Sequence, residues 1–248
     1  TAGGAASSSA SVPLLQAGYP SGKRVAVIGA GPAGLSAAWF LVQRGHKVSI
    51  YDVEENPGGL MRYGVPEFRL PAQVLDQELQ PLWDAGVRFA GGSAFARDES
   101  GLELLEAGFD AIVVTTGGGK RTKNASATSA AEILRRAREG RPVQFTGKVV
   151  VKGDGRVALD TARTALRSGA TEVVVVTHFQ ADTMPVDSRH LAAAQEEGVQ
   201  FEFGAKDTAQ GRAQASGMDD TTVIVAEDPA GGRIEADRFT GRTSTMGV

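Results

Sequence analysis

The chain has 248 residues, a formal net charge of −3 at pH 7, 42% hydrophobic residues and no cysteine. Without cysteine these residues hold no thiolate zinc site, no cysteine-ligated iron–sulfur cluster and no redox-active disulfide. The dispersed charges form no basic stripe for nucleic acid, and no stretch approaches the roughly 18 apolar residues of a membrane helix. We therefore expect a cytoplasmic α/β protein, without nucleic-acid binding or membrane insertion, in which any redox chemistry uses a bound organic cofactor.

The first glycine turn of the chain predicts a nucleotide-binding unit. A buried strand over 23–29 runs into Gly29-x-Gly31-x-x-Gly34, and a helix over 32–44 follows. In such a motif Gly29 makes the tight turn, Gly31 lets the backbone approach a pyrophosphate, and Gly34 lets the helix pack close to the strand. The helix N-terminus then faces the phosphate charge.

An acidic residue follows the second expected strand, which covers residues 46–51. Asp52 lies eighteen residues after Gly34, close to the spacing of roughly 20 at which a carboxylate receives the ribose hydroxyls of a dinucleotide. The acid in register makes this turn more specific than an isolated glycine motif. The alternative, a glycine-rich turn that binds no ligand, remains open from the sequence.

The next elements complete the first half of the chain. Residues 58–66 contain too many glycines for a regular element and predict a loop that wraps a cofactor. A helix is expected over 71–85, and short strands over 87–90 and 93–96. A buried strand over 109–117 ends in Thr-Thr-Gly.

A second strand, glycine turn and helix begin about 120 residues after the first. A helix is expected over 131–139, and the strand ending near Gly153 leads into Gly-Asp-Gly and a helix with Ala158 in the third small position. Its second strand covers 172–177. Two such turns in one chain favour two bound nucleotides.

The pattern divides the chain into four parts. Residues 1–22 are rich in Ala, Gly and Ser and predict a flexible tail, either disordered or wrapped over a partner subunit, because they lack the features of a secretory signal. Residues 23–117 form the first nucleotide domain and 147–248 the second. Residues 118–146 are the expected connector.

These motifs resemble the glutamate synthase small (beta) subunit and its relatives, flavoproteins with two Rossmann-like dinucleotide domains. The resemblance spans residues 23–237 and rests on these stretches: Val25–Gly34, Gly58–Pro66, Thr115–Gly117, Gly153–Arg163, Met184–Pro185 and Ala194–Val199.

The resemblance implies FAD in the first domain and NAD(H) or NADP(H) in the second. Hydride would pass from the nicotinamide to the flavin, and single electrons would then pass to iron–sulfur centres of partner subunits in a hetero-oligomer. The cofactors carry this chemistry, so neither a catalytic acid or base nor a bound metal ion is expected.

The resemblance also implies roles for individual residues. The FAD pyrophosphate would contact Gly29, Gly31, Pro32, Ala33 and Gly34, and Asp52 would bind the adenosine ribose. The flavin side of FAD would contact Gly59, Leu60 and Gly64. Thr116 and Gly117 would contact FAD where the chain leaves the first domain. The nicotinamide dinucleotide would contact Gly153, Gly155, Arg156 and Val157.

The chain departs from the family pattern at its C-terminal end. Members return after the second domain to complete the FAD domain with a further Gly-Asp motif, and residues 238–248 contain nothing equivalent. We therefore expect the first domain to lack its usual completion, with part of the flavin pocket absent or supplied by another chain. The cysteine-rich iron–sulfur segment that often precedes this core is also missing.

The second turn departs as well. Lys152, Asp154 and Arg156 bring three charges into it, and an aspartate beside a pyrophosphate is unfavourable unless it points away or pairs. Thr177-His178-Phe179 replaces the arginine pair that receives an NADP 2′-phosphate, and no acid follows the second strand to indicate NAD. The sequence supports neither preference, and an NADP preference is not expected.

Three interpretations follow. The chain is an FAD-binding electron-transfer subunit of a larger redox complex, or a non-catalytic structural or assembly subunit with a degenerate reductase fold, or a fragment of a longer reductase. The acidic pair Glu196–Glu197 is interpreted as a solvated helix end rather than as catalytic carboxylates.

Overall fold

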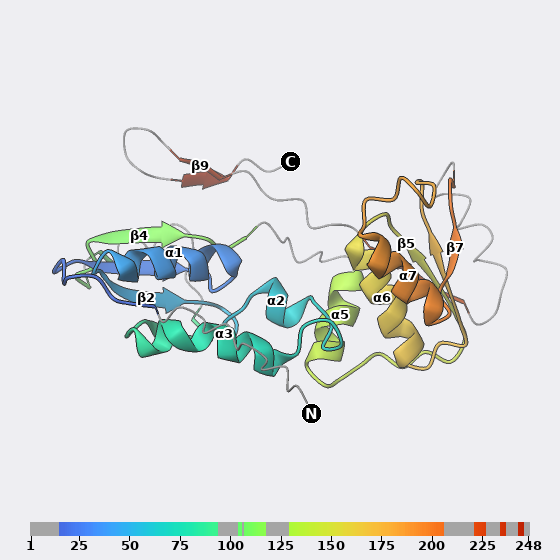
Figure 1. Ribbon diagram of the computed structural model, residues 1–248, viewed down its shortest axis with the longest axis horizontal. Helices are drawn as coiled ribbons and strands as arrows, with labels where there is room; N and C mark the ends of the chain where they lie inside the picture. Colours follow the sequence, from blue (N-terminus) through green and yellow to red (C-terminus); the bar gives the residue numbers. More distant parts are fainter. Residues whose placement is uncertain are drawn as a thin grey trace, which may run out of the picture. The chain divides into compact units, whose positions relative to one another are not determined.

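The chain forms two compact units, each built on its own parallel β-sheet (Figure 1). The first unit contains the described residues up to Gly58 together with Gln73–Thr116. The second contains Gly59–Ala72 together with the described residues from Gly117 onward. The predicted α/β fold with parallel sheets is confirmed. The computed structural model describes residues 15–93, 104–105, 107–117, 129–205, 221–226, 234–236 and 243–245.

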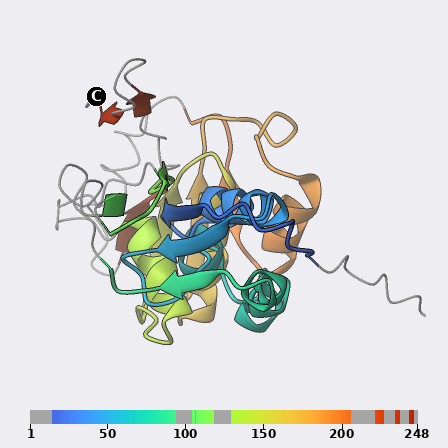
Figure 2. The same ribbon diagram turned by 90° about the vertical axis from the view of Figure 1, so that its left-hand side faces the viewer.

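The first unit is a four-stranded parallel sheet in the order β3-β2-β1-β4 (Figures 1 and 2). Helix α1 (Pro32–Gln43) joins β1 to β2, and α3 (Ala72–Asp84) precedes β3. Val25, Ala26 and Val27 are buried because β1 has a strand on each side, as the continuous apolar run predicts. The strands are β1 (Arg24–Ile28), β2 (Lys47–Tyr51), β3 (Arg88–Ala90) and β4 (Ala111–Val114).

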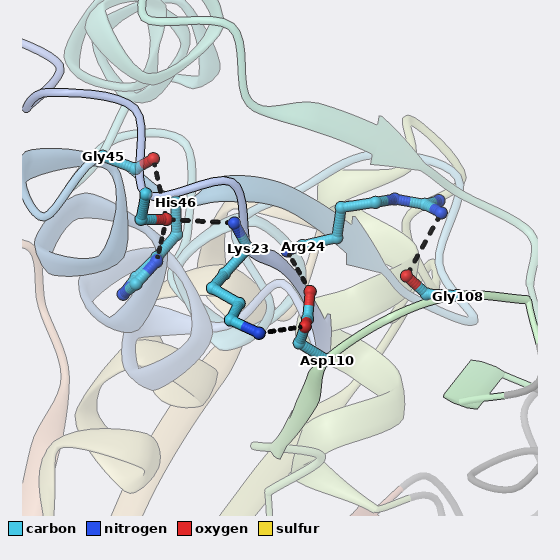
Figure 3. Close-up of polar contacts among 7 residues, drawn as sticks. Lys23, Arg24, Gly45, His46, Gly108 and Asp110 are labelled. Carbon is cyan, nitrogen blue, oxygen red and sulfur yellow. Dashed lines mark hydrogen bonds and ion pairs between the residues drawn. The ribbon is translucent and has the colours of Figure 1, made fainter.

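Polar contacts tie the first sheet together where its strands begin (Figure 3). Nζ of Lys23 lies 2.7 Å from Oδ1 of Asp110, and the backbone N–H of Arg24 donates to Oδ2 of this carboxylate at 2.9 Å. The hydrogen bond from Lys23 lowers the pKa of Asp110. The Arg24 guanidinium lies 4.5 Å from the centroid of the Phe109 ring and donates to the Gly108 carbonyl oxygen. This end of the sheet is opposite the glycine turn, so the cluster connects strands rather than binding a nucleotide.

The segment before β1 is hydrogen-bonded to the first unit. The backbone N–H of Gly18 donates to the Val42 carbonyl oxygen, and that of Ser21 donates to the Gly45 carbonyl oxygen, both at 3.0 Å. The Val42 carbonyl oxygen also accepts from the Gly45 N–H at 2.8 Å, so these bonds join the segment to the turn that ends α1. The flexible tail predicted over 1–22 is therefore too long, and the rest of it lies mostly outside the described residues.

The second unit has a four-stranded parallel sheet in the order β7-β6-β5-β8 (Figure 1). Ala158, Ala162 and Ala165 are fully buried on one face of α6, where their small side chains let the helix pack close to the sheet. Two further short strands, β9 (Ile234–Ala236) and β10 (Thr243–Thr245), pair antiparallel. The sheet contains β5 (Lys148–Lys152), β6 (Glu172–Val176), β7 (Gln200–Glu202) and β8 (Thr221–Val225). The helices are α2 (Leu60–Tyr63), α5 (Ala130–Arg138), α6 (Arg156–Arg167) and α7 (Ser188–Glu196).

The loop predicted over 58–66 contains one helical turn, α2, flanked by Gly59 and Gly64. Four residues are too few to show a helical period in the sequence. The turn packs against α5, where the Arg135 guanidinium lies 5.0 Å from the centroid of the Tyr63 ring. Tertiary contact therefore supplies the stability that local sequence does not.

The connector predicted over 118–146 is also too long. Its described part begins with Ser129, whose hydroxyl caps α5 by accepting from the Glu132 N–H at 3.2 Å. Ile133 and Phe145 are buried in the core of the second unit. Residues from Ser129 onward are thus part of that unit, because apolar side chains on α5 and the following turn complete its core.

Two further observations concern the described residues. The strand predicted over 93–96 lies outside them except for Ser93, which is in no strand. No helix in the described part of the chain is long and apolar enough to cross a membrane.

Candidate dinucleotide-binding sites

The first glycine turn places three glycines in three different environments. Gly29 has a φ of 105°, and a Cβ there would lie 2.4 Å from the Thr115 carbonyl oxygen. A Cβ on Gly34 would lie 1.9 Å from the Gly29 carbonyl oxygen, so any side chain would push α1 away from the turn. A Cβ on Gly31 would meet no described atom within 4 Å. The space in front of Gly31, the N-cap of α1, is therefore open where a pyrophosphate would bind.

Asp52 holds the turn from the end of β2. Its Oδ2 accepts from the Ala30 N–H at 2.5 Å, and its Oδ1 accepts from the Glu54 N–H at 2.9 Å. Each carboxylate oxygen has two lone pairs, so Asp52 keeps acceptor capacity for a ribose hydroxyl. The structure thus brings the predicted ribose acceptor into direct contact with the predicted phosphate turn.

Thr115 supports the turn from the neighbouring strand and was missed by the sequence reasoning. Its Oγ1 lies 2.9 Å from the Ile28 carbonyl oxygen and 3.0 Å from that of Gly29. The sequence shows Thr-Thr-Gly at this strand end but not which threonine faces the turn, because that depends on the register of β4 against β1. The predicted contact, Thr116, is the exposed residue that follows.

Four of the residues predicted to contact FAD belong to the second unit. Gly59 is the N-cap of α2, Leu60 is 61% exposed at its start, and Gly64 follows its end. Gly117 is the first residue of the second unit after β4. Their role at a flavin stays a prediction.

Arg138 attaches the segment 59–72 to α5 within the second unit. Its side chain is only 3% exposed. Its Nε donates to the Arg62 carbonyl oxygen at 2.6 Å, and its Nη1 donates to the Leu70 carbonyl oxygen at 2.8 Å. The same Nη1 pairs with the Glu67 carboxylate. One buried guanidinium therefore satisfies two backbone carbonyls of a segment that has little regular structure of its own.

A buried ion pair attaches the same segment to α6. Nη1 of Arg69 lies 2.5 Å from Oδ2 of Asp160, with side chains 20% and 8% exposed. Burial raises the pKa of Asp160, and the positive charge of Arg69 opposes this shift. The pair fixes the position of the segment, since a buried charge requires its partner.

Glu197 organises a third attachment from the exposed C-terminal end of α7, where the sequence predicts a solvated helix end. It accepts hydrogen bonds from Arg163 and Arg167, with distances of 2.5 to 3.0 Å. The two guanidinium carbons lie 4.5 and 4.0 Å from the centroid of the Phe68 ring. Hydrogen bonds from Arg167 and Arg163 lower the pKa of Glu197 from its ordinary 4.5 to about 2.

We expect Glu197→Gln to destabilise the second unit by about 1–2 kcal/mol at pH 7, after allowance for solvent screening. A lowered carboxylate pKa stabilises the fold above the unfolded value of 4.5, and this stability is lost as pH falls toward about 2. The difference between variant and wild type should therefore shrink between pH 5 and 3 in urea unfolding followed by circular dichroism, with Glu196→Gln as control. A difference that does not change with pH would contradict the assignment.

The second glycine turn has the same frame as the first. The Gly153 N–H donates to the carbonyl oxygen at the end of β6 at 3.1 Å, as the Gly29 N–H does to the end of β2 at 2.7 Å. Gly155 is the N-cap of α6, and Arg156 and Val157 occupy its first two positions. The predicted nicotinamide-site residues are thus adjacent at one helix N-terminus, and their contact with a dinucleotide stays a prediction.

Asp154 points from this turn toward the end of β6. Its Oδ1 accepts from the Thr177 hydroxyl at 2.7 Å and from the His178 N–H at 3.0 Å, and its Oδ2 lies 3.2 Å from Nδ1 of His178. Burial raises the pKa of Asp154, but the hydrogen bonds from Thr177 and His178 outweigh it and lower the pKa below its ordinary value. The carboxylate is ionised at neutral pH and bonded to the end of β6 rather than directed at the helix N-terminus. Asp154 therefore need not repel a pyrophosphate bound at this turn.

The family model described as pyridine nucleotide-disulphide oxidoreductase matches residues 23–240. The chain belongs to the pyridine nucleotide-disulphide oxidoreductase family. Its 248 residues contain no cysteine, so the disulphide of the family's description is not within them. The family supports FAD and NAD(P)H as the cofactors.

Known proteins agree with this assignment. The NADPH-Fe(3+) oxidoreductase subunit beta of Geobacter sulfurreducens is 32% identical over 236 residues, covering 89% of this chain and 35% of that protein. The glutamate synthase [NADPH] small chain of Escherichia coli is 31% identical over 241 residues, covering 89% of this chain and 51% of that protein. The predicted resemblance is confirmed, although the chain spans only about a third to a half of these relatives.

A solved structure shows the same fold. Mycobacterium tuberculosis FprA in complex with NADPH has a TM-score of 0.55 at 19% identity, covering 92% of this chain and 67% of that chain.

The residues of the first turn fit the phosphates of a dinucleotide. In the first turn a Cβ on Gly31 would occupy the open space, and Pro32 and Ala33 place the N-terminus of α1 beside it. The first N–H groups of a helix have no intrahelical acceptor and favour a phosphate. In the second turn Gly155 stands in the same place before α6.

Proposed function

We propose that this chain is an FAD-binding electron-transfer subunit of a larger redox complex. It moves reducing equivalents between a nicotinamide cofactor and iron–sulfur centres of partner subunits. The observation that carries the proposal is the first turn, where an open Gly31, a helix N-terminus and the Asp52 carboxylate lie together. A cytoplasmic location is part of the same proposal.

The chain's own residues bind and orient cofactors in this mechanism. Gly29, Gly31 and Gly34 shape a backbone surface for the FAD pyrophosphate, with Asp52 accepting the ribose hydroxyls. Gly155 and the start of α6 take the corresponding phosphates of the nicotinamide dinucleotide. When bound, the flavin supplies the exchange between two-electron hydride transfer and single-electron transfer, and no protein acid or base is required.

The names of the relatives support a subunit role. The Geobacter protein is called a subunit beta and the Escherichia coli protein a small chain, so both belong to multi-subunit oxidoreductases. A partner that carries iron–sulfur centres would supply the electron acceptor, because the 248 residues contain no cysteine to ligate one.

The proposal predicts flavin absorbance from the purified chain, alone or assembled with its partner. Anaerobic NADH should bleach the oxidised flavin bands, because hydride reduces the bound flavin. Heat release and thin-layer chromatography of the released chromophore would identify FAD. A colourless assembled complex would overturn the proposal.

The alternative of a non-catalytic assembly subunit makes a different prediction. It expects normal electron flux through the complex when the first turn can no longer bind FAD. The altered second turn, with the charged Lys152 buried at the end of β5, is the observation that favours it. Loss of flux in a correctly assembled complex would exclude it.

A further inference from the structure

The two units place their acidic residue at different positions, after the second strand in the first unit and within the glycine turn in the second. In the first unit the residue after β2 is Asp52, and its carboxylate accepts from Ala30 in the turn. In the second unit the residue after β6 is Thr177, and the acid is Asp154 in the turn. The strand registers make these positions equivalent, since Ile28 pairs with Tyr51 as Lys152 pairs with Val176. In both units a hydrogen bond therefore joins the turn to the residue after the second strand. The turn residue Ala30 donates in the first unit, whereas the turn residue Asp154 accepts in the second.

The carboxylate of Asp154 therefore lies at the end of β6, although no acidic residue follows this strand in the sequence. Oδ1 of Asp154 bonds to the Thr177 hydroxyl and the His178 N–H, and Oδ2 faces only the His178 ring nitrogen at 3.2 Å among described atoms. The Asp154 side chain is 34% exposed. Because a carboxylate oxygen has two lone pairs, Oδ2 retains an acceptor direction open to solvent.

We propose that Asp154 makes the second unit select NAD(H) over NADP(H), by accepting the adenosine ribose hydroxyl and repelling a 2′-phosphate. The inference rests on the proposed function, in which this unit binds a nicotinamide dinucleotide. The acid thus acts from the turn rather than from the strand end where such an acid usually lies.

The charges around the site favour this selection. A phosphate carries a charge of about −1.5 to −2 at pH 7, and its repulsion by a nearby carboxylate corresponds to a loss of affinity of about tenfold or more. The Thr177 and His178 hydrogen bonds keep Asp154 ionised. The described strand end continues with His178 and Phe179, so it offers no guanidinium to offset the repulsion.

The test is calorimetric titration of the flavin-loaded protein with NAD⁺ and with NADP⁺, which bind without reducing the flavin. We expect NAD⁺ to bind about tenfold tighter or better. The ratio should fall as salt is raised from low to high concentration, because screening weakens the repulsion. Asp154→Asn should shrink the ratio about tenfold by improving NADP⁺ binding.

Two controls separate charge from structure. Glu172→Gln removes one negative charge at the opposite end of β6, where Glu172 pairs with Lys148 at 2.8 Å, and should leave the ratio unchanged. Thr177→Val removes a hydrogen bond to Asp154 but keeps its charge, and should preserve the NAD⁺ preference.

Each other outcome overturns the inference in a distinct way. Equal affinities, or tighter NADP⁺ binding, contradict the selection and leave the proposed function standing. An NAD⁺ preference that neither salt nor Asp154→Asn changes removes Asp154 as its cause. If neither dinucleotide binds to flavin-loaded protein, the selection fails together with the nicotinamide part of the proposed function, while its flavin part stands.

Discussion

Gly31→Val should abolish FAD binding while the first unit remains folded. The Gly31 backbone has φ −77° and ψ −177°, which any residue adopts, and a Cβ there meets no described atom within 4 Å. We expect the free energy of unfolding to fall by about 1 kcal/mol or less, mainly because valine is a poor N-cap. The branched side chain occupies the space of the pyrophosphate, so FAD affinity should drop by about 100-fold or more.

Gly34→Val provides the matched comparison. The same side chain, three residues later, meets the Gly29 carbonyl oxygen, since even a Cβ would lie 1.9 Å from it. This variant should lose about 3 kcal/mol or more of unfolding free energy. Both tryptophans, Trp39 and Trp83, are in the first unit, so their fluorescence in urea measures its stability directly. If Gly31→Val unfolds the first unit as readily as Gly34→Val, the space at Gly31 is not open, and if Gly31→Val keeps its FAD affinity, that space is not the FAD site.

The Gly31 variant also decides between the two subunit roles. In a complex assembled with Gly31→Val, an electron-transfer subunit loses flux because its flavin is absent. An assembly subunit retains flux. Size-exclusion chromatography shows whether the variant complex assembles normally. Electron flux through the assembled complex then distinguishes an electron-transfer subunit from an assembly subunit.

Arg138→Met should destabilise the second unit by about 2–4 kcal/mol. Methionine fills similar volume but leaves the Arg62 and Leu70 carbonyl oxygens without their donor in the position where Arg138 is 3% exposed. In urea, circular dichroism should show the second unit unfolding at a lower urea concentration than in the wild type. The midpoint of the tryptophan fluorescence transition, which reports on the first unit, should not change. The segment 59–72 should also become more sensitive to limited proteolysis.

Arg136→Met is the control for this prediction. Arg136 lies on the same helix, and its Nε donates to the Arg141 carbonyl oxygen at 3.3 Å in an exposed hydrogen bond. Its loss should cost less than about 1 kcal/mol. Equal effects of the two substitutions would show that Arg138 does not attach the segment.

The first turn could be read from the sequence because its determinants are local. Gly29, Gly31 and Gly34 lie within six residues, and their steric roles follow from backbone geometry alone. Asp52 follows a short helix and strand of regular length, so its position was also predictable. Thr115 was not, because it reaches the turn only through the pairing of β4 with β1.

The segment 59–72 shows where local reasoning failed. Its glycines predicted an irregular loop of the first domain, yet it belongs to the second unit. The side chains that hold it come from positions far along the chain, namely Arg138 on α5 and Asp160, Arg163 and Arg167 on α6. No pattern within the segment encodes these partners, since charged residues on a helix face are usually solvated.

The sequence by itself determined the two glycine turns, the parallel strands around them and the family to which the chain belongs. These features depend on spacing between residues close together in the chain, where sterics leave few alternatives. Only the tertiary structure decided which unit holds residues 59–72 and where Asp154 directs its charge. Both depend on contacts between distant segments, because an ion pair or a hydrogen bond forms only when folding brings its two partners within about 3 Å.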